Sequence, residues 1–339
     1  MTTKKTNKIP AKTPGETANN AIETKNAPKN HTEISVVVPF YNESDSIETF
    51  FSRVIPILKK LQTSFEIICI NDGSKDNSLE KLIDQKNKLA TVCTIKIIDF
   101  SRNFGKDAAL TAGLDYASGN CIVPMDCDLQ DPPELIEKMV EKWREGNDVV
   151  LAKRADRSED TVFKRLSASL FYKISDNLMS VQLPENVGDF RLMDRKVVDV
   201  IKNFSERTRF MKGLFAFAGF KSAVVEYKRP ERAHGKTKWN YWKLWNYAID
   251  GITSFSLVPL KLSTYFGLLV TILAFSRGAL IMYRVIRYGI EVPGYASLMV
   301  AILFFGGVQL MSLGIIGEYV GRTYIESKKR PIYIVRSIM

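Results

Sequence analysis

Two long apolar stretches toward the C-terminal end place the strongest constraint on how this chain can fold. Residues 262–283 are apolar apart from Arg277, and residues 296–320 form a second stretch of the same kind. A helix of about 22 residues is about 33 Å long, which is enough to cross the hydrocarbon core of a bilayer. Buried helices of a soluble protein are the alternative. The two stretches predict a transmembrane hairpin with helices at 262–283 and 296–320.

The basic residues around these stretches predict the orientation of the hairpin. The short connection holds Arg284 and Arg287, whereas more lysines and arginines precede the first stretch and follow the second. Positively charged loops tend to stay on the cytosolic side of a membrane. We therefore expect a two-span protein of the inner (plasma) membrane with a cytosolic large domain. Residues 321–339 would form a basic cytosolic tail.

The first 32 residues have a different composition. They carry six lysines, and Ile9 and Ile22 are their only large aliphatic side chains. A segment of this composition cannot bury enough apolar surface to fold, and it lacks the apolar core of a secretory signal. We expect residues 1–32 to be a disordered basic tail.

Between residues 33 and 230, short apolar runs alternate with helical patterns. The runs are typical of buried strands, and they cover residues 34–40, 65–70, 95–100, 121–125 and 148–152. This alternation favours an α/β, Rossmann-like domain with a mainly parallel sheet and right-handed crossovers. Four cysteines without Cys-x-x-Cys spacing, together with only two histidines, predict reduced thiols and no zinc site.

Residues 231–261 have the composition of a membrane-interface segment. Trp239, Trp242 and Trp245 fall within seven residues and are interleaved with lysines. Such rings lie at headgroup level, and ammonium groups meet lipid phosphates. The formal net charge of +11 also admits nucleic acid as a partner, but the adjoining apolar stretch favours the bilayer. We expect an interfacial amphipathic segment and no nucleic acid.

An acidic pair follows one of the predicted strands. Asp126 and Asp128 come directly after the apolar run at 121–125, and Gln130 follows two residues later. In open α/β sheets, ligands bind outside the carboxyl ends of the strands. Mg²⁺ prefers oxygen ligands and is commonly shared between one or two carboxylates and substrate phosphates. The pair is thus half of a candidate metal site that substrate would complete, although an ordinary acidic turn remains the alternative.

Two other predicted strands also end in polar side chains. Glu43 follows the first strand and Asp72 follows the second, so all three acidic sites should lie on the same edge of the sheet. Tyr41 could stack on a nucleoside base, and Asp72 could accept a hydrogen bond from the base or the ribose. Helix N-caps are the alternative role for these acidic residues.

Three ordered motifs carry a resemblance to a known family. VVVPFYNES at 36–44, INDGSKDNS at 70–78 and MDCDLQDPP at 125–133 resemble the signature blocks of family 2 inverting glycosyltransferases with the GT-A fold. From about residue 34 onward the chain is similar to polyisoprenyl-phosphate glycosyltransferases such as dolichyl-phosphate mannose synthases. SRNFGKDAAL at 101–110, GDFRLMDR at 188–195, HGKTKW at 234–239 and the two apolar spans resemble most the bactoprenol glucosyltransferases of O-antigen modification.

The resemblance implies a function and a set of site residues. One sugar, glucose in the first instance, would pass with inversion from a UDP-sugar to undecaprenyl phosphate, a polyisoprenyl phosphate. On that reading the nucleoside is held by Pro39, Tyr41, Glu43 and Asp72. Mg²⁺ or Mn²⁺ is held against the diphosphate by Asp126, Asp128 and Gln130.

The acceptor chemistry narrows what else the site needs. A phosphate monoester with a second pKa of about 6 is already largely dianionic at neutral pH, so no catalytic base is required. Cations must instead hold two anionic substrates together. The candidates are Arg154 and Arg157 for the acceptor phosphate, Lys238, Arg232 and Lys236 for the diphosphate, and Arg207 and Arg209 as further cations. Asp156 and Asp160 could orient the arginines, and a base role for either stays open.

Several alternatives remain at this stage. Within the enzyme class, the donor could be GDP-mannose or a UDP-linked modified aminopentose. A non-catalytic, membrane-anchored nucleotide-binding scaffold is the reading from a different class. Small residues in the second span, Gly306-Gly307 and the run from Gly314 to Gly317, could let helices approach closely in a homo-oligomer.

Overall fold

The computed structural model describes residues 32–155, 181–228, 250–289 and 294–339, all within one compact unit that begins at Thr32. Its first part alternates strands and helices in the order β1 (Ile34–Phe40), α1 (Ile47–Lys60), β2 (Phe65–Asn71), α2 (Ser78–Lys88), β3 (Thr94–Phe100), α3 (Lys106–Tyr116), β4 (Cys121–Pro124), α4 (Leu135–Arg144) and β5 (Val149–Arg154). The elements that follow are β6 (Val187–Asp194), α6 (Arg195–Lys202), α7 (Met211–Phe217), β7 (Ser222–Tyr227), α9 (Val258–Tyr288), α10 (Tyr295–Lys328) and β8 (Val335–Ile338).

These strands form a single eight-stranded sheet in the order β7-β5-β6-β4-β1-β2-β3-β8. Strand β1 pairs in parallel with β2 on one side and β4 on the other, and β2 pairs in parallel with β3. Strand β6 is antiparallel to both β4 and β5, whereas β7 is parallel to β5. The predicted mainly parallel α/β sheet is confirmed.

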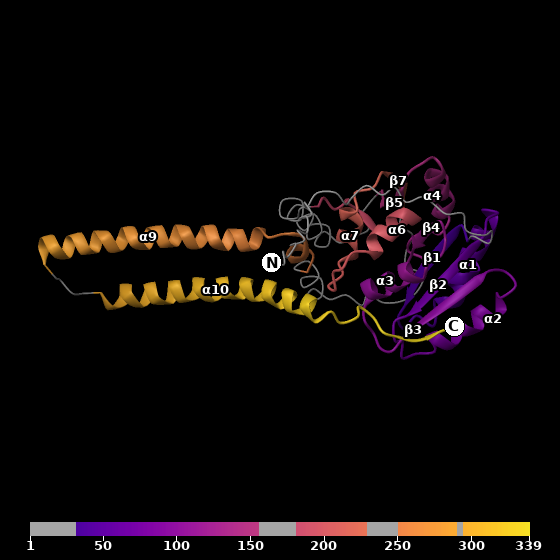
Figure 1. The fold of residues 1–339 in the computed structure, drawn as a ribbon, viewed down its shortest axis with the longest axis horizontal. Coiled ribbons are helices and arrows are strands. Elements are labelled where there is room, and N and C mark those ends of the chain that lie inside the picture. Colours follow the sequence, from indigo (N-terminus) through magenta and orange to yellow (C-terminus); the bar gives the residue numbers. More distant parts are fainter. Residues whose placement is uncertain (1–31, 156–180, 229–249, 290–293) are drawn as a thin grey trace, which may run out of the picture. The chain divides into compact units, whose positions relative to one another are not determined.

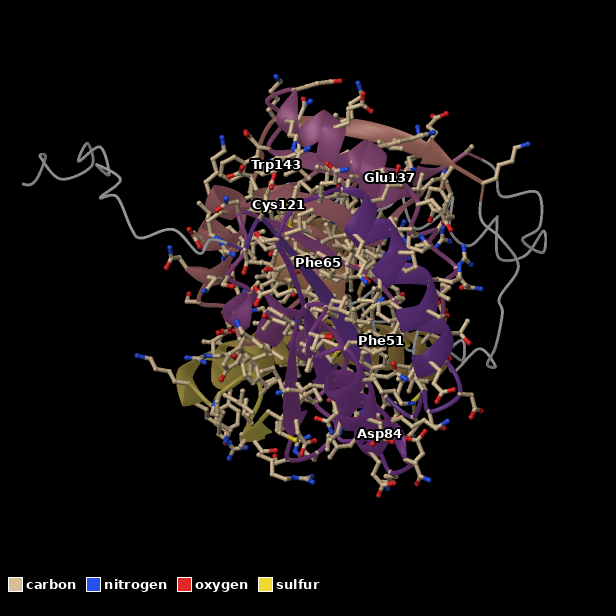
Figure 2. The ribbon with its side chains drawn as sticks, turned by 90° about the vertical axis from the view of Figure 1, so that its right-hand side faces the viewer. Phe51, Phe65, Asp84, Cys121, Glu137 and Trp143 are labelled. Carbon is tan, nitrogen blue, oxygen red and sulfur yellow. The ribbon has the colours of Figure 1, made fainter. Side chains whose placement is uncertain are left out.

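Helices cover both faces of this sheet (Figure 1). Alternate residues of β1 supply the two cores: Val36 and Val38 pack with α1, α2 and α4, whereas Val37 packs with α3, α6 and α7. Phe51 of α1 and Phe65 at the start of β2 belong to the first of these layers (Figure 2). Burial on both faces explains why the strands read as continuous apolar runs without alternation.

The second layer brings α3 unusually close to the sheet. A Cβ atom added to Gly113 would lie 2.0 Å from Cγ1 of Val37, so only glycine fits this position. Small alanine side chains on the same helix, Ala109 and Ala112, are fully buried. The close approach fixes the start of α3 at the carboxyl edge of the sheet, where it matters for the site.

The two predicted membrane helices are present and are longer than the apolar stretches suggested. Helices α9 and α10 are long and apolar enough to cross a membrane, and no part of their most apolar windows is buried in the protein. The hydroxyl of Ser263 donates to that of Ser312, 3.0 Å away, and so links the two helices. A Cβ on Gly306, Gly307, Gly314 or Gly317 would meet no atom within 4 Å, so these glycines do not mediate the packing of α10 on α9.

The C-terminal residues differ from the sequence expectation of a basic tail at 321–339. Helix α10 continues to Lys328, and β8 then pairs antiparallel with β3 at the edge of the sheet. The ring of Tyr333 stacks on Phe100, with centroids 5.1 Å apart, and its hydroxyl donates to Asp115 at 2.7 Å. An unpaired edge at β3 explains the difference, because it offers backbone groups that a short strand can satisfy. The sequence analysis also did not identify β6 and β7 as strands.

Near the start of β2, a buried carboxylate joins several elements. Glu66 of β2 accepts hydrogen bonds from the hydroxyl of Ser35 at 2.6 Å and from the hydroxyl and amide of Ser118 at 2.6 and 2.7 Å. Lys96 of β3 lies 2.9 Å from its other oxygen. One side chain therefore joins three neighbouring strands and the connection between α3 and β4.

Replacing Glu66 with glutamine should destabilise the protein, because the amide group would turn its own donors toward the donors of Ser118 and Lys96. We expect a loss of about 2 kcal/mol in the free energy of unfolding. The measurement is the unfolding temperature of the full-length protein in detergent, followed by intrinsic fluorescence. Glu80→Gln, an exposed position on α2, is the matched control and should leave it unchanged.

The same pair of proteins tests a pH dependence. Burial alone raises the pKa of Glu66, but the hydrogen bonds from Ser118, Ser35 and Lys96 outweigh it and lower the pKa below the ordinary 4.5. Stabilisation by this carboxylate is therefore complete above pH 4.5 and is lost as the pH falls through the folded-state pKa. The difference in unfolding temperature between wild type and Glu66→Gln should shrink on acidification, and a growing difference would contradict this assignment.

Candidate functional site

The carboxyl ends of β4, β1 and β2 lie side by side, because these three strands are adjacent and parallel. Backbone hydrogen bonds continue past the strand ends: the amide of Asp72 donates to the carbonyl of Phe40 at 2.9 Å, and that of Met125 donates to Val37 at 3.0 Å. The expectation that Glu43, Asp72 and the acidic pair share one edge is confirmed. We call this edge, with the loops that follow β1, β2 and β4, the acidic rim.

The loops after β1 and β2 interlock at the acidic rim. The amide of Asn42 donates to the hydroxyl of Ser74 at 3.0 Å, and the side-chain oxygen of Asn42 accepts from the amide of Lys75 at 2.8 Å. Asn42 has a φ of +51°, a left-handed conformation that asparagine tolerates better than most residues. The resulting double contact holds the segment from Pro39 to Glu43, which contains three of the predicted nucleoside contacts.

Asp72 has a clear structural partner in the loop before α3. Its two carboxylate oxygens accept from the amides of Phe104 and Gly105, at 2.6 and 3.0 Å, and the residue is only 3% exposed. Burial raises the pKa of Asp72 although these hydrogen bonds oppose it. The N-caps of α1 and α2 are Ser46 and Asn77, so neither Glu43 nor Asp72 is the helix cap that was the alternative reading.

The residues that were predicted to bind metal alternate with buried ones. Asp126, Asp128 and Gln130 are partly exposed, whereas the intervening Cys127 and Leu129 are 5% and 4% exposed. Leu129 takes a φ of +55°, and the amide of Gln130 donates to the carboxylate of Asp128 at 3.2 Å. The tight turn therefore leaves two carboxylates and one amide accessible along the loop after β4.

A lysine that the sequence analysis did not single out binds the first of these carboxylates. The ammonium nitrogen of Lys106 lies 2.7 and 2.8 Å from the two oxygens of Asp126 and 2.7 Å from Asp189. Lys106 is the first residue of α3, and Asp189 belongs to β6. Both residues fall within motifs quoted for the family resemblance, at 101–110 and 188–195, but no local pattern indicated that they meet.

Charges around this lysine shift the titration of its neighbours. Burial alone would raise the pKa of Asp189, yet the positive charges of Lys106 and Lys212 hold it well below its usual range. The next residue along α3 behaves differently: burial, together with the negative charge of Asp189, raises the pKa of Asp107 to about 7. Carboxylates next to the acidic rim thus differ widely in their readiness to ionise.

The donor set at this position suits a hard divalent cation, as far as the described residues go. Asp126 already holds a cation, the ammonium group of Lys106, with both of its oxygens. Over residues 32–155, 181–228, 250–289 and 294–339 there is no cluster of three or more His, Cys, Asp or Glu that could hold a metal by itself. Asp126, Asp128 and Gln130 could supply oxygen ligands to part of a coordination shell, and substrate phosphates commonly complete such shells for Mg²⁺.

Arg154 ends β5 on the same side as the acidic rim, because β5 is antiparallel to β6 and β6 is antiparallel to β4. Its Nε donates to the hydroxyl of Tyr227 at 3.4 Å, and that hydroxyl donates a short hydrogen bond to Asp131. Burial, with the charge of Asp131, raises the pKa of Tyr227 to about 12. The phenol links Arg154 to the residue that follows the predicted metal ligands.

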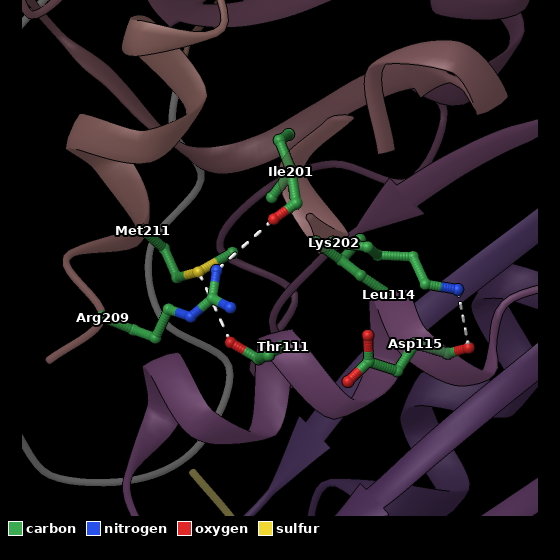
Figure 3. A pocket seen from close by; sticks show the side chains of 7 residues that line it. All are labelled: Thr111, Leu114, Asp115, Ile201, Lys202, Arg209 and Met211. Carbon is green, nitrogen blue, oxygen red and sulfur yellow. Dashed lines mark hydrogen bonds between the residues drawn. The ribbon is translucent and has the colours of Figure 1, made fainter. Parts of the chain in front are cut away.

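Most of the other predicted cations are not among the residues that the structure describes. Arg157, Arg232, Lys236 and Lys238, with Asp156 and Asp160, lie outside the described residues. Arg209 lies within the described residues. Its guanidinium donates to the carbonyls of Phe204 at 2.7 Å and Ile201 at 3.4 Å, beside a small cavity (Figure 3). These carbonyls lie at and just after the end of α6, and the expected role of Arg209 as a further substrate-binding cation stays a prediction.

Polar contacts join the base of the hairpin to the sheet domain. Arg322 of α10, whose side chain is 14% exposed, pairs with Asp250 at 2.6 Å and with Glu318 at 2.9 Å. Glu326, one turn further, accepts from the backbone amides of Arg207 and Thr208 at 2.7 and 3.3 Å. The loop that contains Arg207 is thus bound to α10, close to where the chain leaves the predicted membrane region.

Comparison with known proteins places this architecture in a family. The family described as "Glycosyl transferase family 2" matches residues 35–202, and the "GtrB C-terminal hairpin" matches residues 258–323. An uncharacterized glycosyltransferase of Synechocystis sp. is 54% identical over 90% of this chain and 95% of its own length. The bactoprenol glucosyl transferase of Shigella phage SfV is 49% identical over 90% of this chain and 98% of its own.

Among solved structures, glucosyl-3-phosphoglycerate synthase from Mycobacterium tuberculosis, in complex with Mn²⁺, UDP-glucose and phosphoglyceric acid, is similar at 21% identity. That match covers 66% of this chain and 78% of the other, with a TM-score of 0.41. The relatives at about half identity decide the question, since they match the sheet domain and the hairpin together. The chain belongs to the family 2 glycosyltransferases: it is a glycosyltransferase with a GT-A-like domain and a C-terminal, membrane-anchoring GtrB hairpin.

Proposed function

We propose that this protein transfers one glucose from UDP-glucose to bactoprenol phosphate, that is undecaprenyl phosphate, with inversion at the anomeric carbon. The observation that carries this proposal is the 49% identity over 90% of the chain with a bactoprenol glucosyl transferase, which spans the acidic rim and the hairpin alike. A prophage bactoprenol glucosyl transferase homolog of Escherichia coli, 50% identical over the same share, supports it. The product is a lipid-linked sugar.

In this proposal the donor binds along the acidic rim. Pro39, Tyr41 and Glu43 lie in the segment held by the Asn42 contacts, and Asp72 holds the adjoining loop, so the four residues form one side of a nucleoside pocket. Asp126, Asp128 and Gln130 hold Mg²⁺ or Mn²⁺ against the diphosphate. The metal, when bound, neutralises charge that develops on the departing diphosphate.

The acceptor binds through cations, and its own charge supplies the nucleophile. Its phosphate is largely dianionic at neutral pH, so an oxygen can attack the anomeric carbon without a base to remove a proton. Arg154, aligned by Tyr227 at the carboxyl end of β5, holds this phosphate together with Arg157. Lys238, with Arg232 and Lys236, closes on the diphosphate.

The hairpin explains how the lipid acceptor reaches this site. Keeping a polyisoprenyl chain in the bilayer is favourable by about 0.8 kcal/mol per CH₂ group, so the site must come to the headgroup plane. The hydrogen bonds from the amides of Arg207 and Thr208 to Glu326 hold α10 against the domain that carries the acidic rim. With the positive-inside rule, both ends of the hairpin and the catalytic domain are cytosolic, in the inner membrane.

The proposed reaction can be tested with detergent-purified protein, undecaprenyl phosphate and Mn²⁺. Each of UDP-glucose, UDP-galactose, UDP-N-acetylglucosamine and GDP-mannose is supplied in turn, and lipid products are read by mass spectrometry. We expect a hexosyl phospholipid from UDP-glucose alone. A product from GDP-mannose would instead support the mannosyl alternative, and nucleotide binding without any lipid product would support a non-catalytic scaffold.

Asp128→Asn should lower kcat in this assay by at least about 100-fold, because it removes a charge that the proposed metal needs. The unfolding temperature should stay close to that of wild type, since Asp128 is partly exposed. Asp84→Asn, on the exposed side of α2, is the matched control for the loss of one carboxylate (Figure 2). Wild-type kcat in Asp128→Asn would remove this residue from the site.

Arg154→Gln tests the acceptor side of the site separately. Removing the guanidinium should raise the KM for undecaprenyl phosphate by about tenfold or more, since a charge-assisted contact to phosphate is lost. The dissociation constant of UDP should change little, because Arg154 lies on β5, away from the nucleoside loops. Lys153→Gln, the neighbouring strand position, is the control. A larger effect on UDP binding than on the acceptor KM would contradict the assignment.

A further inference from the structure

The contact between Lys106 and Asp126 occupies the carboxylate that the proposed metal would need. The ammonium nitrogen lies almost symmetrically between the two oxygens, at 2.7 and 2.8 Å. Metal–oxygen distances for Mg²⁺ are 2.0–2.1 Å, so an ion bound to the same oxygens would lie close to the ammonium group. Two cations at that separation repel each other strongly. Lys106 and a metal ion therefore compete for Asp126.

Lys106 has a second anchor that does not belong to the predicted metal site. Asp189 lies 2.7 Å from the same nitrogen and comes from β6, not from the loop that carries the metal ligands. Asp189 is 15% exposed, less than the 38% of Asp126. If the ammonium group leaves Asp126, it keeps a carboxylate partner that is less exposed than Asp126.

The backbone that carries Lys106 is held to the nucleoside side of the acidic rim. Gly105, the N-cap of α3, donates its amide to Asp72 at 3.0 Å and takes a φ of +99°. Phe104 donates to the same carboxylate at 2.6 Å. The position of Lys106 thus depends on the loop that the proposed nucleoside pocket includes, which gives the nucleotide a physical connection to the lysine.

We propose that Lys106 is a tethered cation that neutralises Asp126 in the nucleotide-free enzyme and yields this carboxylate to the metal when UDP-sugar binds. The ammonium group then remains on Asp189 and faces the incoming diphosphate. This inference deepens the proposed function and rests on it. Lys106 is a positioning residue: it makes metal binding weak without nucleotide and strong with it. By linkage, the metal strengthens nucleotide binding by the same factor.

The test measures Mn²⁺ binding directly by electron paramagnetic resonance of the full-length protein in detergent, with and without UDP. In wild type, UDP should tighten Mn²⁺ binding. In Lys106→Met, Mn²⁺ binding without UDP should become at least about fivefold tighter than in wild type, and the further gain on adding UDP should shrink. Lys106→Arg, which keeps the charge, should behave more like wild type.

A second lysine separates competition for Asp126 from a general effect of charge. The charge of Lys212, on α7, acts to lower the pKa values of Asp189 and Asp107. Among the contacts of the described residues, none joins Lys212 to Asp126. Lys212→Met should change Mn²⁺ binding without UDP much less than Lys106→Met does. Equal changes in the two variants, or unchanged or weaker binding in Lys106→Met, would overturn the proposal.

For Asp189→Asn we expect the opposite change in Mn²⁺ binding to that of Lys106→Met. Without its second anchor, Lys106 should hold Asp126 more firmly, and Mn²⁺ binding without UDP should weaken by a few-fold. UDP binding and the unfolding temperature verify that each variant is folded. If wild-type protein forms lipid-linked glucose and Lys106→Met binds Mn²⁺ as wild type does, this inference alone is overturned. Wild-type protein that binds no Mn²⁺ even with UDP would overturn both this inference and the proposed metal site.

Discussion

The parallel pairing of β4, β1 and β2 is the constraint on which the rest of this protein depends. It brings three loops, separated by tens of residues in the chain, to one edge of the sheet. The loops after β2 and β4 begin with a backbone hydrogen bond that extends the strand pairing, so their polar side chains follow directly from the pairing that holds the core.

Several carboxylates at one edge repel one another. In this fold, cations and hydrogen-bond donors offset that repulsion. Asp72 is satisfied by two amides, Asp126 and Asp189 share Lys106, and Asp131 accepts from Tyr227, which in turn contacts Arg154. These arrangements keep the acidic rim compatible with folding before any substrate arrives. They also leave cations in place for ligands that carry phosphate groups.

The hairpin is joined to the sheet domain at its base and at the end of the chain. Glu326 accepts from the amides of Arg207 and Thr208, Arg322 pairs with Asp250 just before α9, and β8 extends the sheet beyond β3. Arg336 of β8 reaches the carbonyl of Ser101 at 3.1 Å, at the start of the loop that Asp72 holds. Helix α10 and the loop that Asp72 holds are thus connected through one short strand.

The sequence by itself determined the fold class, the presence of two membrane helices, and the shared edge of Glu43, Asp72 and Asp126, because continuous apolar runs and their polar ends are local patterns. Only the tertiary structure decided the partners of those residues. Lys106 meets Asp126 and Asp189 across 20 and 83 residues, Arg209 donates to the carbonyl of Phe204 just beyond the end of α6, and Val335–Ile338 becomes a strand. Such contacts depend on which elements pack together. The sequence alone does not show whether a charged side chain contacts solvent, a carbonyl or a carboxylate.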